Sequence, residues 1–200
     1  MKEQDYDQLL NIQTAGEQNG FYSSYHYHRY EPTPYRALEL LFEQYKLTSD
    51  DYIVDFGCGK GRLAFYIHYF FHATVKGIEM IEDYYHDALV NLESYFANKK
   101  RRDGDVQFYH CFAEEYPIAP LDNRFYFFNP FSIQIFMKTI NHILVSIEQI
   151  PRTVELILYY VSDEYLFYLE NCTLFELKQE VVIPEMKDSN ERFLIYRLVG

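Results

Sequence analysis

Tryptophan is absent from this chain of 200 residues, and cysteine occurs only at Cys58, Cys111 and Cys172. The three cysteines are widely spaced and form no CxxC pair, which indicates free thiols rather than a metal site or a disulfide framework. Reduced thiols are typical of the cytoplasm, and we expect that location. Residues 1–7 are polar and acidic, unlike a secretory signal.

Basic residues are also scarce, with 18 Lys and Arg against 30 Asp and Glu and a net charge of −12. This charge disfavours long-range attraction to nucleic acid or an anionic membrane, so we expect duplex DNA not to be a partner. The one dense basic run, residues 99–102, is more typical of a solvated helix end. No run of 18 apolar residues occurs, and we expect no membrane partner.

Aromatic residues are abundant, with 21 Tyr and 17 Phe in a chain that is 48% hydrophobic. Length and composition predict one domain with a full core. We divide the chain into an N-terminal arm, residues 1–30, with weak periodicity, and a single folded domain, residues 31–200. His26 and His28 lie in a Tyr-rich stretch without a carboxylate cluster, so we predict no metal site.

The most informative stretch is a strand, a glycine turn and a helix in succession. Residues 52–56 are apolar except for Asp55, and Gly57, Gly59 and Gly61 follow at alternate positions. Glycine adopts positive φ at little cost and lets a ligand approach the backbone. Such a corner is where open α/β sheets bind ligands. The third glycine comes one residue too early for the dinucleotide pattern G-x-G-x-x-G, which disfavours a nicotinamide-dependent oxidoreductase.

Five β-α units followed by a β-rich pair predict the fold class. We expect an α/β, Rossmann-like, seven-stranded and mostly parallel sheet with helices on both faces and a C-terminal antiparallel hairpin. Thr33 is expected to cap the helix that precedes the first strand, and Asp163 a later one. The predicted strands are residues 52–56, 74–79, 105–109, 124–128, 153–161, 172–183 and 191–199.

The segment Asp55-Phe-Gly-Cys-Gly-Lys-Gly61 resembles motif I, D-x-G-x-G-x-G, of class I S-adenosylmethionine-dependent methyltransferases. The resemblance covers about residues 30 to 199. It implies that Asp55, Gly57, Gly59 and Gly61 bind S-adenosyl-L-methionine. An acid that ends the second strand, here Glu79, would accept the ribose hydroxyls. The alternative for Glu79 is an ordinary acid at a helix N-terminus.

Two further cofactor contacts come from the same resemblance. The stretch Tyr30-Glu-Pro-Thr-Pro-Tyr35 is similar to a Thr-Pro element in some adenine N6-methyltransferases, which implies that Thr33 and Tyr35 line the cofactor's amino-acid end. A plain helix start is the alternative. Where many family members carry an acid-Ala pair facing the adenine, this chain has Phe112 before Ala113, and we expect Phe112 to flank the adenine.

The segment Asn129-Pro130-Phe131 resembles motif IV, (D/N/S)-P-P-(Y/F/W), of amino-methyltransferases, without the second proline. The resemblance implies methylation of a planar nitrogen. The Asn129 oxygen and the Pro130 carbonyl would hold the amine, and Phe131 would stack on the flat acceptor. The alternative is a strand end with a Pro turn and a core Phe.

The acceptor stays open between a small molecule, a protein side chain and a structured RNA. If a hydroxyl of a small molecule were methylated, a base would be needed, and His26 or His28 could serve. Tyr27, Tyr30 and Phe131 are candidates for contact with a sulfonium methyl. A second reading is a non-catalytic module that binds S-adenosylmethionine without transferring its methyl group. The sequence does not indicate an oligomeric state.

Overall fold

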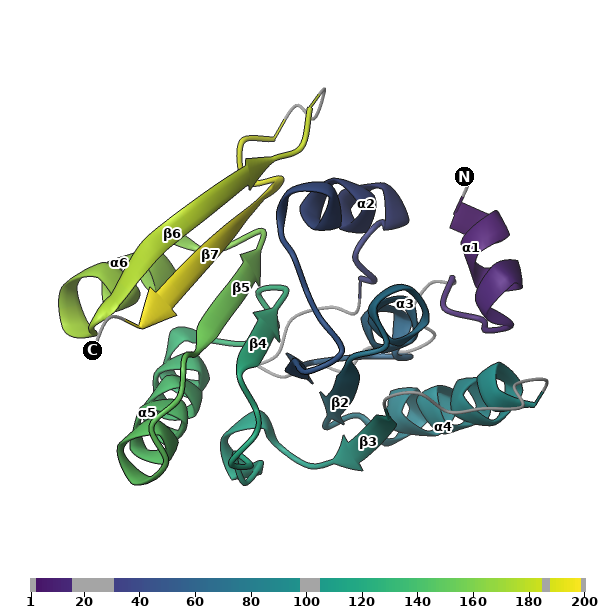
Figure 1. The fold of residues 1–200 in the computed structure, drawn as a ribbon, viewed down its shortest axis with the longest axis horizontal. Coiled ribbons are helices and arrows are strands. Elements are labelled where there is room, and N and C mark those ends of the chain that lie inside the picture. The colour runs from purple at the N-terminus through teal and green to yellow at the C-terminus, as the bar shows by residue number, and fades with distance from the viewer. Residues whose placement is uncertain (1–2, 16–30, 98–104, 185–187, 199–200) are drawn as a thin grey trace.

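The structure is a computed structural model that describes residues 3–15, 31–97, 105–184 and 188–198 (Figure 1). Seven strands form one sheet in the order β3-β2-β1-β4-β5-β7-β6. The first five run parallel, and β7 lies antiparallel between β5 and β6. The predicted fold class is therefore confirmed. The strands are β1 Tyr52–Phe56, β2 Thr74–Glu79, β3 Val106–His110, β4 Arg124–Phe127, β5 Glu155–Tyr159, β6 Phe175–Val182 and β7 Arg192–Leu198.

Helices cover both faces of this sheet, as predicted (Figure 1). Side chains alternate along each strand, so Tyr126 enters the core under α2 and α3 while Phe125 and Phe127 enter the core under α5 and α6. None of the helices in the described residues is long and apolar enough to cross a membrane. The helices are α1 Glu3–Leu10, α2 Tyr35–Gln44, α3 Arg62–Phe71, α4 Glu82–Phe96, the 3-10 turn η1 Ala113–Glu115, α5 Ile133–Gln149 and α6 Asp163–Cys172.

Both predicted helix caps are wrong by one residue. Pro34 is the N-cap of α2, and the Thr33 hydroxyl bonds the Tyr126 hydroxyl at 2.7 Å instead. Asp163 is the first residue of α6, and the preceding Ser162 caps it by accepting from the Tyr165 N–H. In each case a neighbouring residue takes the cap, because a tertiary contact or a better-placed hydroxyl decides the position.

The N-terminal arm belongs in part to the folded unit. Tyr6, Leu10 and Ile12 are buried in the same core as α2 and α3. The Tyr6 ring stacks on the Tyr35 ring with 4.6 Å between centroids. Residues 3–15 therefore pack as an additional layer over this face, whereas residues 16–30 of the predicted arm lie outside the described residues.

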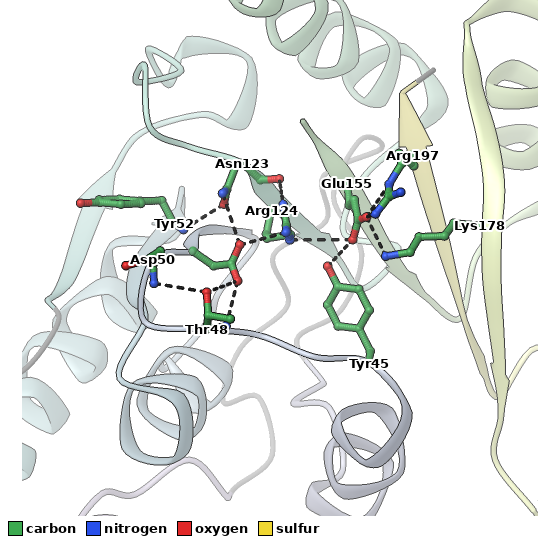
Figure 2. A network of polar contacts seen from close by, with 10 residues as sticks. Tyr45, Thr48, Asp50, Tyr52, Asn123, Arg124, Glu155, Lys178 and Arg197 are labelled. Atoms are coloured by element: carbon green, nitrogen blue, oxygen red, sulfur yellow. Dashed lines mark hydrogen bonds and ion pairs between the residues drawn. The ribbon is translucent and has the colours of Figure 1, made fainter. Parts of the chain in front are cut away.

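A buried ion-pair network closes the amino edge of the sheet (Figure 2). Glu155, the first residue of β5, is 1% exposed. Burial alone would raise its pKa, but donors from Lys178, Tyr45 and Arg197 hold the pKa of Glu155 below its usual value. The Tyr45 hydroxyl and Lys178 Nζ each lie 2.7 Å from a Glu155 oxygen. This network joins the end of α2 to β5, β6 and β7.

Tyrosine hydroxyls satisfy many of the surplus carboxylates. In the described part of the chain, seven phenols donate to an Asp or Glu oxygen, although the sequence holds only 18 basic side chains for 30 acidic ones. A phenol is a neutral donor, so it satisfies a carboxylate without a second charge. The pairs are Tyr6–Glu39, Tyr35–Asp7, Tyr45–Glu155, Tyr116–Asp122, Tyr159–Glu191, Tyr160–Asp188 and Tyr196–Glu170.

Candidate functional site

The glycine turn after β1 adopts a conformation that only glycine takes easily. Gly57, Gly59 and Gly61 have φ values of 78°, 54° and 85°. A Cβ on Gly61 would lie 2.5 Å from the Phe108 ring, so a side chain is excluded there for steric reasons as well. The Gly57 N–H donates to the Ile78 carbonyl at 2.9 Å, which fastens the turn to the end of β2.

Glu79, at the end of β2, holds this turn from the side. Its Oε2 accepts from the Gly59 N–H at 2.9 Å, and its Oε1 accepts from the Ile81 N–H at 2.8 Å. The side chain is buried, with 6% of it exposed. Burial raises the pKa of Glu79, and the backbone N–H donors oppose that rise. The carboxylate is thus fixed in place next to the glycines.

Asp55 is the second buried carboxyl of the site. It is 4% exposed, and burial followed by the charge of Glu79 raises its pKa to about 8. Among the described residues no Lys or Arg pairs with either carboxyl. Two buried acids without a basic partner cost folding free energy, and a cationic ligand between them would relieve that cost.

The Asn129-Pro130 segment lies against the glycine turn. It follows β4, which pairs in parallel with β1. A Cβ on Gly57 would lie 2.8 Å from Pro130 Cβ, so the two segments are in contact. Asn129 has a φ of 39°, a left-handed conformation that Asn tolerates better than most residues. Backbone strain of this kind is often found where a side chain or carbonyl must point at a ligand.

Phe131 lies in the core rather than at the edge of the sheet. Its ring is 1% exposed and packs edge-on against Phe127 at 6.1 Å. Its carbonyl accepts the Tyr165 hydroxyl. A flat acceptor has no access to this ring, so the predicted stacking by Phe131 is wrong for this conformation. Phe128, half-buried and packed on Tyr159 with 4.6 Å between ring centroids, is the aromatic that the sequence reasoning missed at this edge.

The two residues from the Thr-Pro element lie in different surroundings. The Thr33 hydroxyl contacts Tyr126, which stands opposite Asp55 in the sheet register. Tyr35 is buried under α1, and its hydroxyl donates to Asp7 at 2.6 Å. Thr33 therefore lies near the motif I strand, whereas both the ring and the hydroxyl of Tyr35 contact α1.

Phe112 follows β3 at the same carboxyl edge. It is 45% exposed, and the preceding Cys111 N–H donates to the Glu79 carbonyl at 3.2 Å. A planar ligand bound at Glu79 would thus find an exposed ring on the next strand. No three His, Cys, Asp or Glu side chains in the described residues are grouped to hold a metal ion. The candidates His26, His28, Tyr27 and Tyr30 lie outside the described residues.

Neither a family model nor a curated protein matches this sequence. Solved structures do. An RNA methyltransferase from Salinibacter ruber in complex with S-adenosyl-L-homocysteine aligns with a TM-score of 0.57 at 17% identity, covering 84% of this chain and 92% of that chain. A putative RNA methyltransferase from Pyrococcus horikoshii aligns with a TM-score of 0.56 at 17% identity, and the alignment covers 98% of this chain and 97% of that chain.

A precorrin-6y C5,15-methyltransferase from Geobacter metallireducens aligns with a TM-score of 0.56 at 17% identity, covering 82% of this chain and 86% of that chain. The fold is that of a Rossmann-like methyltransferase. In that fold the carboxyl edge gathers the loops that follow the parallel strands, and there this chain brings together the glycine turn, Asp55, Glu79, Asn129 and Phe112. The same edge holds Phe128, but not the ring of Phe131.

Proposed function

We propose that this protein binds S-adenosyl-L-methionine at the glycine turn and transfers its methyl group to an acceptor. The observation that carries the proposal is the pair of buried carboxyls, Asp55 and Glu79, beside a turn of positive-φ glycines with no basic partner in the described residues. A ligand with a sulfonium and an ammonium group fits that charge, and ribose hydroxyls fit a fixed carboxylate.

Each site residue has a proposed task in holding the cofactor. Glu79 accepts the ribose hydroxyls, Phe112 flanks the adenine and Asp55 balances the cationic end. Thr33 is proposed to line the amino-acid end. For Tyr35 we propose support of that end from behind, because its side chain contacts α1.

The bound cofactor supplies a methyl group already activated on a positively charged sulfur, so the protein mainly positions the two reactants. The Asn129 oxygen and the Pro130 carbonyl are proposed to hold the hydrogens of an acceptor amine, with the nitrogen lone pair aimed at the methyl. A neutral amine loses its proton to solvent after the transfer, so no general base is needed. Phe131 is proposed to support this loop from the core. The contact with the flat acceptor, which the sequence assigned to Phe131, is proposed to come from Phe128 instead.

The proposed reaction is therefore N-methylation of a planar nitrogen on a small molecule, a protein side chain or a structured RNA. The similar structures include enzymes named for RNA and for a precorrin, which span two of these classes. The net charge of −12 disfavours duplex DNA as acceptor. The proposed location is the cytoplasm, as expected from the wide spacing of the three cysteines in the sequence.

The second candidate is a module that binds the cofactor without catalysis. The burial of Phe131 and the missing second proline after Pro130 both favour it over an intact amino-methyltransferase motif. Transfer to an oxygen of a small molecule is the third candidate. It requires a base, and the two histidines proposed for that role, His26 and His28, lie outside the described residues.

Calorimetry with S-adenosylmethionine, S-adenosylhomocysteine and NAD tests the proposed function. We expect the first two to bind and NAD not to bind. Binding of NAD alone would overturn the assignment. Incubation with methyl-labelled cofactor and fractionated lysate then separates enzyme from binding module, because only an enzyme labels a fraction. The variant Gly61→Ala, which places a methyl against Phe108, serves as the binding-deficient control.

A further inference from the structure

Arg62 is a buried basic side chain placed directly after the last glycine of the turn. It is the first residue of α3 and is 5% exposed. Its Nε donates to the Thr14 hydroxyl at 2.7 Å. Its Nη1 lies 2.6 Å from a Glu3 carboxylate oxygen and 3.2 Å from the Thr33 carbonyl. One guanidinium thus binds three points of the N-terminal segment.

Most of these partners are themselves held in place. Thr14 is fully buried, and its N–H and hydroxyl both donate to Asp7. Tyr35 lies under the guanidinium, with 4.3 Å from Arg62 Cζ to the ring centroid, and its hydroxyl also donates to Asp7. The Tyr35 N–H donates to Glu3. Arg62 is therefore bound to a connected polar unit rather than to scattered residues.

A second contact joins the same arm to the glycine turn itself. Asn91 of α4 is 4% exposed. Its Oδ1 accepts from the Gln13 N–H at 2.8 Å, and its Nδ2 lies 3.2 Å from the Gln13 carbonyl. The same Nδ2 donates to the Lys60 carbonyl at 3.0 Å. Lys60 lies between Gly59 and Gly61, so Asn91 connects residue 13 of the arm to the middle of the turn.

Arm and turn are therefore joined by polar contacts through Arg62 and Asn91. A turn with three glycines loses much conformational entropy on ordering, and contacts that fix it improve ligand binding by pre-organisation. A hydrogen bond to a charged group is stronger than one between neutral groups, and its loss from a buried arginine leaves donors unsatisfied. Removing an arm contact should thus lower the population of the binding-competent turn.

We propose that Arg62 positions the cofactor-binding turn by fastening it to the N-terminal arm, so that residues 3–14 support cofactor binding without touching the cofactor. The proposal rests on the proposed function for its ligand. This role differs from simple packing of α1 against the core, because it requires the hydrogen bonds between Arg62 and the arm. Loss of those bonds lowers cofactor affinity by more than the loss of global stability explains.

The experiment compares Thr14→Val with Thr14→Ser in the full chain. Valine keeps the shape but removes the hydroxyl that Arg62 and Asp7 share, whereas serine keeps it. Tyr45→Phe is the matched control, because it removes one hydrogen bond to a buried charge, Glu155, at the opposite edge of the sheet. Calorimetry gives the affinity for S-adenosylmethionine, and urea unfolding gives the stability of each variant.

We expect Thr14→Val to bind S-adenosylmethionine about fivefold to tenfold more weakly. Thr14→Ser and Tyr45→Phe should stay within about twofold of the parent. Amide exchange of residues 59–63 should accelerate in Thr14→Val and not in Tyr45→Phe, even without ligand. Parental affinity or parental exchange rates in Thr14→Val would each overturn the positioning role. Equal weakening in Tyr45→Phe would overturn it too, because the effect would then be global.

The two proposals fail in different ways. If the parent protein binds neither S-adenosylmethionine nor S-adenosylhomocysteine, the proposed function fails. The exchange experiment still decides whether Arg62 couples the arm to the turn, since it needs no ligand. If the parent binds and the Thr14→Val exchange rates are unchanged, only the positioning proposal fails.

Discussion

Binding of S-adenosylmethionine should release a proton from Asp55. The pKa of this carboxyl is raised to about 8 by its burial and by the nearby charge of Glu79. At pH 7 a group with that pKa is about nine-tenths protonated. A cation placed within about 4–6 Å of a carboxyl favours its ionised form and lowers the pKa by about 1–3 units.

The size of the effect follows from these values. If the bound pKa of Asp55 falls to about 7, roughly 0.4 proton leaves at pH 7, and if it falls to about 5, roughly 0.9 proton leaves. Because the free protein holds the proton and the complex does not, acid opposes binding. Affinity should therefore rise as the pH increases from about 6 to 8, with a slope equal to the number of protons released, and level off above the free pKa.

Calorimetry at pH 7 in buffers of different ionisation enthalpy measures the released proton directly. S-adenosylhomocysteine is the matched ligand because it lacks the sulfonium charge, and it should release less. Asp55→Asn is the matched variant because the amide keeps the shape and does not titrate. An S-adenosylmethionine binding enthalpy that is identical in all buffers would refute the reasoning, as would the same proton release from Asp55→Asn.

Three further predictions address the cofactor, the acceptor and the stability. Glu79→Gln should bind S-adenosylmethionine about tenfold more weakly, measured by calorimetry, and unchanged affinity would remove Glu79 from the site. Asn129→Gly, which tolerates the positive φ, should keep affinity within about threefold but slow labelled methyl transfer ~100-fold, and parental transfer would make the loop only a turn. Glu155→Gln removes the buried negative charge that Lys178 and Arg197 bind, and it should lower the free energy of unfolding in urea at pH 7 by about 2 kcal/mol. The cost stays moderate because both cations remain partly exposed and can be solvated by water. The folded pKa of Glu155 lies below its unfolded value, so the parent should lose this stability as the pH falls below about 4 and the variant should not.

The fold was largely predictable because its signals are local. The predicted strands 52–56 and 74–79 are β1 and β2 residue for residue, and Gly57 and Glu79 mark where they end. The C-terminal strands are shorter than predicted, with β6 at Phe175–Val182 instead of residues 172–183. There α6 continues to Cys172 and the apolar run gives no sign of where the helix stops.

The side-chain directions at the site were not predictable in the same way. Along β4 the aromatic side chains alternate between the two cores, with Phe125 and Phe127 in one and Tyr126 in the other, and the left-handed Asn129 follows the strand. Phe131 then turns into the core below α5, where the Tyr165 hydroxyl bonds its carbonyl. Its direction depends on α6, which lies more than 30 residues away in the sequence.

The contacts of Arg62 were not predictable from the sequence either, because they also join residues that are far apart along the chain. Its partners Glu3, Thr14 and Thr33 lie 59, 48 and 29 positions from it in the sequence. A basic residue after a glycine turn has no distinctive local pattern, and its burial depends on where the arm docks. The only local sign is a charge placed within a helix start that is otherwise apolar.

The phenol–carboxylate bonds described above have a consequence for how this protein responds to salt. Added ions weaken pairs of opposite charges, with a screening length of about 10 Å at 0.1 M and about 3 Å at 1 M. A neutral phenol carries no charge to be screened, so its bond to a carboxylate persists as the ionic strength rises. Meanwhile, the repulsion among the surplus acids declines. Because seven carboxylates of a chain with a net charge of −12 are bound by phenols, we expect this protein to lose less stability in concentrated salt than one that pairs those carboxylates with lysine or arginine alone.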